Sequence, residues 1–308
     1  CGDVGIGISP SLAECVRNAD LILSIGARLG EMTSGGYTLF SIPQPTQRMV
    51  HVHPSSEELG RVYQAELMIN AGMQEFAAAA ANLAAVDSSR WRDWTHRGRE
   101  GYLKNLKHGV MPGALDLGEV MAFLRGRLPE NAIITNGAGN YSGWVQRFYQ
   151  YTGFRTQLAP TNGAMGYGVP SAIAAKLVHR DRVVVSFSGD GCFMMNGQEL
   201  ATAVQYDLPV LFIVVNNGMY GTIRMHQERE YPGRVHATAL NNPDFAALAK
   251  AYGLHGEVVN RTAEFEPAFE RALASDKPAL LELRIDPEAI TTRSSLTSLR
   301  EQALSAGR

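Results

Sequence analysis

Two apolar segments joined by a short helix constrain the fold more than any other feature of this sequence. Residues 209–215 are almost continuously apolar, which is typical of a strand buried on both faces of a sheet, and residues 182–188 predict a second strand. Residues 197–206 predict a helix between them, with Asn196 as N-cap and Glu199 completing a capping box. A strand–helix–strand unit of this kind makes a right-handed crossover between parallel strands. The sequence therefore predicts an α/β fold built on a parallel sheet.

The pattern on either side extends this sheet and adds a smaller one. We expect one domain at 114–290, with further strands at 132–135, 156–158, 257–259 and 279–285 and helices at 115–128, 170–177, 244–252 and 263–275. A partial Rossmann-like domain is expected at 1–85, with strands at 19–26, 48–53 and 67–70 and helices at 9–16, 55–62 and 72–85. A linker that contains a helix is expected at 86–113, and a surface tail at 291–308.

Composition and charge exclude several classes of protein. The 308 residues carry 28 Lys and Arg against 30 Asp and Glu, so no basic excess points to nucleic acid or to an anionic membrane. The longest solidly apolar run, 210–215, is far shorter than the ~20 residues of a membrane-spanning helix. The three cysteines lack zinc-site spacing, which is typical of free thiols in a reducing, cytoplasmic environment.

Polar residues follow the two strands of the crossover at the point where each strand ends. Asp190 stands between two glycines after the first strand, and Asn217 follows the second. Because parallel strands end at the same edge of a sheet, these two side chains are expected to meet there. Carboxylate and amide oxygens suit magnesium or calcium rather than zinc. Either segment alone is a common turn, but their shared edge favours a metal site that also holds the phosphates of a ligand.

The same residues resemble a known motif. The run 189–191, then 24 residues, then Asn216 and Asn217 resembles the thiamine diphosphate motif of the superfamily of acetolactate synthase, pyruvate decarboxylase and benzoylformate decarboxylase. The flanking runs 193–195, 198–203 and 208–210 are most similar to acetolactate synthase large subunits. This resemblance implies the three-layer, parallel-sheet thiamine diphosphate-binding fold in the later residues and the second half of a Rossmann-like central domain in the earlier ones.

The resemblance also implies that a part of the enzyme precedes this chain. Nothing here corresponds to the N-terminal pyrimidine-binding domain of the family, and Cys1 lies inside a glycine-rich loop, so we expect a fragment with sequence missing upstream. In the family that domain, from a neighbouring subunit, supplies the glutamate that activates the cofactor. We therefore assign no catalytic residue to this chain and expect it to be inactive alone. The intact protein is expected to be a homodimer or homotetramer formed through that domain.

Several site residues are carried over from the family. Asp190 and Asn217 are expected to bind Mg²⁺ through side-chain oxygens, and Met219 through its carbonyl. The expected cofactor contacts are Gly139, Asn140, Tyr141, Gly163, Met165, Gly189, Gly191, Cys192 and Tyr220. Met165 is expected beneath the bent cofactor, and the Gly163 carbonyl is expected to accept a hydrogen bond from its aminopyrimidine. Only the backbone of Cys192 is expected to take part, so that Cys192→Ala should have little effect.

Departures from the family pattern separate the possible activities. Thr222, Ile223 and His226 are the expected substrate pocket. Simple pyruvate decarboxylases carry an acid at the position of Ile223, and acetolactate synthases a tryptophan at that of His226. The favoured function is thiamine diphosphate- and magnesium-dependent decarboxylation of a 2-keto acid, followed by carboligation as in acetolactate synthase. The first alternative is a benzoylformate decarboxylase-like enzyme without carboligation, because the run 218–224 is similar to that subfamily.

Two further predictions concern FAD binding and a function without catalysis. Some synthases bind FAD in the central domain, but residues 30–32 depart from their usual run, so FAD is not expected. A non-catalytic nucleotide-binding or regulatory paralogue is the second alternative. The retained Asp190 and Asn217 argue against it, and no Gly-x-Gly-x-x-Gly follows a strand.

Overall fold

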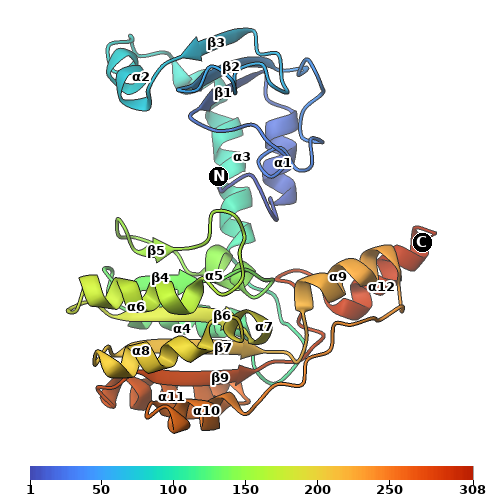
Figure 1. The fold of residues 1–308 in the computed structure, drawn as a ribbon. Helices are drawn as coiled ribbons and strands as arrows, with labels where there is room; N and C mark the ends of the chain where they lie inside the picture. The colour runs from blue at the N-terminus through green and yellow to red at the C-terminus, as the bar shows by residue number, and fades with distance from the viewer. Residues whose placement is uncertain (308) are drawn as a thin grey trace. The chain divides into compact units, whose positions relative to one another are not determined.

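The computed structural model describes residues 1–307 and divides the chain into two compact units, Cys1–Lys107 and His108–Arg308 (Figure 1). Each unit contains one sheet, and every strand pair in both sheets is parallel. The predicted α/β class is therefore confirmed. No helix of the described residues is long and apolar enough to cross a membrane.

The sheet of the second unit has six strands in the order β5-β4-β6-β7-β9-β8. Their bounds are Ile133–Asn136 (β4), Gln157–Leu158 (β5), Val184–Gly189 (β6), Val210–Asn216 (β7), His255–Val259 (β8) and Ala279–Arg284 (β9). β6 and β7 pair directly from Val184 with Val210 to Gly189 with Val215. The predicted crossover thus exists, and both of its strands end at the same edge.

Helices cover both faces of this sheet and bury two separate apolar layers (Figure 1). One layer packs under α4 (Leu117–Arg127), α5 (Ser142–Phe148) and α11 (Thr262–Ala274), and the other under α6 (Gly168–Val178), α8 (Leu200–Gln205) and α10 (Phe245–Ala251). The side chains of β7 alternate between the layers: Phe212 joins the second and Ile213 the first. The unit therefore has the predicted three-layer arrangement, which holds the strand ends in fixed positions.

The helix of the crossover begins differently from the prediction. A 3-10 turn over Gly197–Glu199 precedes α8, and the Asn196 side chain makes no cap. The Asn196 amide donates instead to the Gly166 carbonyl at 2.9 Å. The Glu199 carboxylate accepts from the Thr202 hydroxyl at 2.7 Å rather than closing a capping box. The predicted cap is therefore wrong, because Asn196 is used to hold the loop that contains Gly166.

The residues from 291 onward, expected to be a surface tail, contain the helix α12 (Leu296–Ser305). Ser295 caps it by accepting from the Ser298 N–H at 3.1 Å. Leu296 and Leu299 are buried with Met225 and Ile290 in a cluster against α9 (Gly221–Glu230). The segment is ordered because its apolar residues recur at the spacing of one helix face.

The first unit contains the sheet β1-β2-β3, over Leu21–Ile25, Arg48–His53 and Leu67–Asn70. Its helices are α1 (Pro10–Arg17), α2 (Met73–Ala80) and α3 (Arg92–Asn105), with a 3-10 turn over Ser88–Trp91. Ser9 caps α1 as predicted, whereas residues 55–62 form turns instead of the predicted helix. α3 packs against α1, so the helix expected in the linker belongs to this unit.

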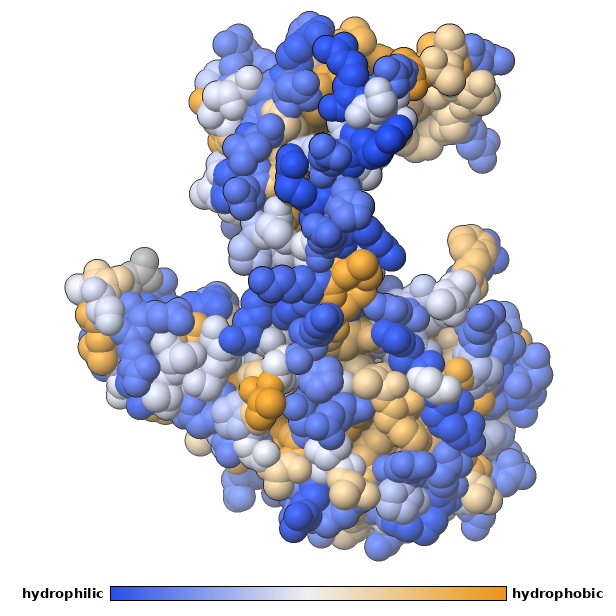
Figure 2. Space-filling view, turned by 180° about the vertical axis from the view of Figure 1, so that it is seen from behind, coloured by the Kyte–Doolittle hydropathy of each residue, from blue (hydrophilic) through white to orange (hydrophobic). Residues whose placement is uncertain are grey.

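Apolar side chains remain at the surface of the first unit. α2 has no buried residue, and Leu83 and Val86 just after it are 76% and 74% exposed. Figure 2 shows hydrophobic groups on the viewed face of this unit among hydrophilic ones. On β1, Leu21 and Leu23 are also about half exposed, at 51% and 53%. The second unit, with its two covered layers, is the better-packed scaffold for a site.

Core packing in the second unit predicts a stability difference between two phenylalanines. Phe269 is fully buried, with its ring 5.4 Å from that of Phe123, whereas Phe154 is 87% exposed. Phe269→Ala should lower the free energy of unfolding by about 3–5 kcal/mol, and the control Phe154→Ala by less than about 0.5 kcal/mol. Urea unfolding of both variants measures this, and equal midpoints would contradict the described core.

Candidate functional site

A cleft opens where β4, β6 and β7 end, and it brings together most of the predicted site residues. Those that line it are Gly139, Asn140, Tyr141, Met165, Gly189, Asp190, Gly191, Cys192, Asn217, Met219, Tyr220, Thr222 and Ile223. Gly163 and His226 are not among its lining residues. Gly163 lies on an exposed turn, and His226 is exposed on α9. The pairing of parallel strands explains this gathering, since residues far apart in sequence leave the sheet at one edge.

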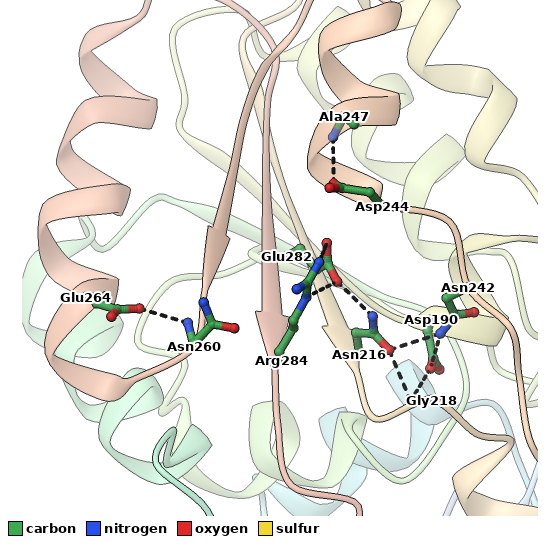
Figure 3. A network of polar contacts seen from close by, with 10 residues as sticks. All are labelled: Asp190, Asn216, Gly218, Asn242, Asp244, Ala247, Asn260, Glu264, Glu282 and Arg284. Atoms are coloured by element: carbon green, nitrogen blue, oxygen red, sulfur yellow. Dashed lines mark hydrogen bonds and ion pairs between the residues drawn. The ribbon is translucent and has the colours of Figure 1, made fainter.

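The Asp190 carboxylate lines the cleft and is buried, with the residue 3% exposed. Figure 3 shows it beside Asn242 and Gly218. Its Oδ1 accepts from the Gly191 N–H, and its Oδ2 accepts from the Gly218 N–H and the Asn242 amide, each at 2.8 Å. Burial raises the pKa of this carboxyl, and these three hydrogen bonds, together with the Met219 N–H, oppose that rise. The donors come from the start of α7 (Asp190–Phe193), the loop after β7 and the segment before α10.

A second polar layer supports the first (Figure 3). The Asn242 amide also donates to Asn216 Oδ1 at 3.0 Å, and Asn216 Nδ2 donates to the fully buried Glu282 at 2.8 Å. Glu282 in turn accepts from Arg284 at 2.8 Å. Asn242 was not among the site residues predicted from the sequence. The Asn-Pro pair at 242–243 marks a turn in the sequence but gives no sign of the contact with Asp190.

The oxygen atoms at this edge fit a hard divalent cation. A carboxylate offers about four lone-pair positions, and that of Asp190 accepts from the three donors above and also interacts with the Met219 N–H. Asn217 Oδ1 also accepts once, from the Met219 N–H at 3.3 Å. Within residues 1–307 no group of three or more His, Cys, Asp or Glu side chains gathers, so such side chains alone would not complete a metal site. The residues present therefore suit Mg²⁺ or Ca²⁺ with oxygen ligands supplied in part by a bound molecule.

Two tyrosine rings explain why glycines flank Asp190. A Cβ atom on Gly189 would lie 2.9 Å from the Tyr141 ring, and one on Gly191 would lie 2.7 Å from the Tyr220 ring. Both distances are shorter than van der Waals contact allows, so a larger residue would displace a ring from the cleft wall. From the sequence, both glycines were expected as cofactor contacts. In the structure they also make room for these rings.

The Cys192 side chain connects three loops of the site. Cys192 is 3% exposed. Its sulfur accepts from the Gly166 N–H at 3.1 Å and from the Tyr141 hydroxyl at 3.4 Å. Burial raises the pKa of Tyr141 well above its usual value, and the neighbouring Cys192 thiol adds to this rise. The Tyr141 hydroxyl therefore remains a hydrogen-bond donor. Sequence reasoning assigned only the backbone of Cys192 to the site. The contacts give its thiol a role in holding the loop that carries Met165.

Carboxylate chemistry in the cleft is restricted to one residue. Among the described residues that line it, Asp190 is the only Asp or Glu. Ile223 lies at the first turn of α9 with 54% of its surface exposed. At this position the cleft therefore offers an apolar side chain and no proton donor.

Comparison with known proteins agrees with this geometry. Residues 137–283 match the model of the C-terminal TPP-binding domain of thiamine pyrophosphate enzymes, and residues 1–80 match the model of their central domain. The chain belongs to the thiamine pyrophosphate enzyme family. Asp190 and Asn217 both lie within the matched C-terminal domain.

Relatives within this family include acetolactate synthases. The chain is 30% identical over 308 residues to the acetolactate synthase large subunit of Corynebacterium glutamicum, covering 94% of this chain and 47% of the relative. It is 28% identical over 274 residues to the isozyme 2 large subunit of Escherichia coli, covering 88% and 48%. The chain thus spans about half the length of these relatives.

A solved structure of the family has the same fold. The thiamine diphosphate-dependent 4-hydroxybenzoylformate decarboxylase of Rhodococcus jostii matches with a TM-score of 0.69 at 26% identity. The match covers 89% of this chain and 50% of that one. The resemblance drawn from the sequence and the predicted thiamine diphosphate-binding fold are both confirmed.

The Cys192 contacts predict that the thiol, and not only the backbone, matters. Cys192→Ala leaves the buried Gly166 N–H without its acceptor and should lower the free energy of unfolding by about 1–3 kcal/mol. Cys192→Ser keeps an oxygen acceptor and should recover most of that loss. Thermal unfolding of both variants, beside the control Cys15→Ala in the first unit, measures the effect. Identical stability of the Ala variant and the unmodified protein would contradict a role for the thiol.

Proposed function

We propose that the second unit binds thiamine diphosphate through Mg²⁺, and that the intact protein decarboxylates a 2-keto acid and joins the product to a second carbonyl compound. The observation that carries this proposal is the buried Asp190 carboxylate, which lines the same cleft as Asn217 within the residues that match a TPP-binding domain. Asp190, Asn217 and the Met219 carbonyl would hold the metal. The metal would neutralise the diphosphate.

Other residues of the cleft would orient the cofactor. Bound thiamine diphosphate supplies a nucleophilic carbon and an electron sink for decarboxylation. Met165, 38% exposed on its loop, offers an apolar support, and Tyr141 and Tyr220 form the walls beside Gly189 and Gly191. Asp190 is already held by three donors before any ligand enters, so binding requires little reorganisation of its carboxylate.

Ile223 favours carboligation over simple decarboxylation. An acid at this position would deliver a proton and promote release of an aldehyde. The apolar side chain supplies no proton, which favours attack on a second carbonyl compound. The acetolactate synthase large subunits among the relatives support the same choice.

A non-oxidative decarboxylase is the second candidate. It is favoured by the similarity to 4-hydroxybenzoylformate decarboxylase and by the benzoylformate decarboxylase-like run at 218–224. We further propose a cytoplasmic homo-oligomer, in which a domain preceding these residues completes the catalytic site. A non-catalytic paralogue has no physical need for an Asp190 held ready in this way.

Product analysis separates the two activities. The intact protein, with Mg²⁺ and thiamine diphosphate, should convert pyruvate to acetolactate with little free acetaldehyde. Ile223→Glu should shift the products toward aldehyde, because the acid supplies the missing proton. Ile223→Leu is the matched control and should keep the acetolactate fraction. Aldehyde as the sole product, formed only from benzoylformate, would replace the carboligase proposal with the decarboxylase.

Metal dependence tests the site itself. Asp190→Asn keeps the size of the side chain but removes its charge. Cofactor affinity should fall by more than about 100-fold, since even groups that only orient a metal ligand contribute about 10–100-fold. Quenching of the Trp144 fluorescence in the cleft, titrated with cofactor in Mg²⁺ and then in EDTA, gives this measurement. Unchanged affinity in Asp190→Asn, or in EDTA, would overturn the assignment.

A further inference from the structure

Asn140 lies in the cleft at the end of the loop after β4, but its side chain faces other parts of the protein. Its Oδ1 accepts from the Thr222 hydroxyl at 3.0 Å, and its own backbone N–H donates to that hydroxyl at 3.0 Å. Its Nδ2 donates to the Ile290 carbonyl at 2.9 Å and to the Met225 sulfur at 3.3 Å. The residue thus joins the start of α9 to the segment that precedes α12.

The hydrogen-bonding capacity of Asn140 is largely used in these contacts. An asparagine side chain has two N–H donors, and the backbone adds one. The donors on Nδ2 are directed to Ile290 and Met225, and the backbone donor is directed to Thr222. A diphosphate accepts hydrogen bonds and donates none when ionised. Asn140 therefore has no donor left to offer a diphosphate unless it releases the C-terminal segment.

The segment that Asn140 holds forms a wall of the cleft. Ile285, Ala289 and Ile290 line the cleft, and Ile290 is 1% exposed in the cluster that joins α9 and α12. Ion pairs hold the far end of this segment, in α12. The fully buried Glu228 of α9 forms ion pairs with Arg224 of the same helix and with Arg300 of α12.

We propose that Asn140 is a positioning residue that anchors the C-terminal segment 285–305 to the cleft, and that it does not bind the diphosphate. Asn140 holds the segment at Ile290, between the bonds of Ile285 to Asn216 and of Thr292 to Arg147, and Glu228 holds it at Arg300. The same contact places Thr222 and, with it, the first turn of α9 that carries Ile223. The anchoring follows from the contacts alone, whereas its consequence for cofactor binding rests on the proposed function.

Limited proteolysis tests the anchor without any cofactor. Asn140→Asp keeps the shape and the acceptor for Thr222 but removes both Nδ2 donors to Ile290 and Met225. Tryptic cleavage after Arg293 and Arg300 in the intact, cofactor-free protein should be about fivefold faster in this variant, because cleavage follows the opening of the segment. Asn131→Asp, the same change at an exposed turn residue, is the matched control and should cleave at the unmodified rate. Equal rates in Asn140→Asp and the unmodified protein would overturn the proposal.

A second variant separates anchoring from cofactor binding. Thr222→Val removes the Thr222 hydroxyl and so breaks its contact with Asn140. A positioning role predicts that Asn140→Ala and Thr222→Val each accelerate cleavage, and that the double variant is cleaved more slowly than the sum of the two effects predicts. If Asn140 were instead a cofactor ligand, Asn140→Ala would weaken thiamine diphosphate binding and leave apoprotein cleavage unchanged. Failure of the unmodified protein to bind the cofactor would count against the proposed function, while the cleavage rates would still decide the role of Asn140.

Discussion

The Asp190 carboxylate is the interaction on which the site depends. A buried charge is unfavourable unless hydrogen-bond donors surround it, and the three donors here come from three different segments of the chain. Gly191 begins α7, Gly218 lies in the loop after β7, and Asn242 precedes α10. Each segment must therefore be in place for the second unit to fold with Asp190 ionised. The same requirement arranges the cleft before any ligand enters it.

This dependence continues into the sheet through a chain of polar contacts. Asn242 bonds both Asp190 and Asn216, and Asn216 bonds the fully buried Glu282 of β9. Asn216 and Glu282 lie on the adjacent strands β7 and β9, and Asp190 and Glu282 at the two ends of the network are buried, whereas Asn216 and Asn242 are half-buried. Low local dielectric strengthens a satisfied network and makes a broken one costly. The orientation of Asp190 therefore depends on the packing of the sheet, because the polar contacts connect the two.

The sequence predicted those features that depend on strand periodicity. The pairing of β6 with β7, and hence the meeting of Asp190 with the loop of Asn217, follows from two apolar strands and the handedness of their connection. Contacts made by irregular segments could not be predicted in this way. Two backbone hydrogen bonds join the loop after β7 to the segment before α10: the Tyr220 N–H donates to the Thr238 carbonyl, and the Leu240 N–H donates to the Gly218 carbonyl. Asn242 reaches Asp190 because these bonds hold the two segments together. No periodic pattern encodes such a contact, and the same is true of the Cys192 thiol.

Family resemblance and local geometry answer different questions about the same residues. Resemblance assigns Gly189, Gly191 and Asn140 to the cofactor because of where they stand in a motif. The contacts show that the two glycines leave space for tyrosine rings and that Asn140 holds the C-terminal segment. Asp190 and Asn217 offer a carboxylate and an amide oxygen to the same cleft. A motif thus marks the edge of the sheet where a ligand binds, while the number of unused donors and acceptors decides which of its residues can contact that ligand.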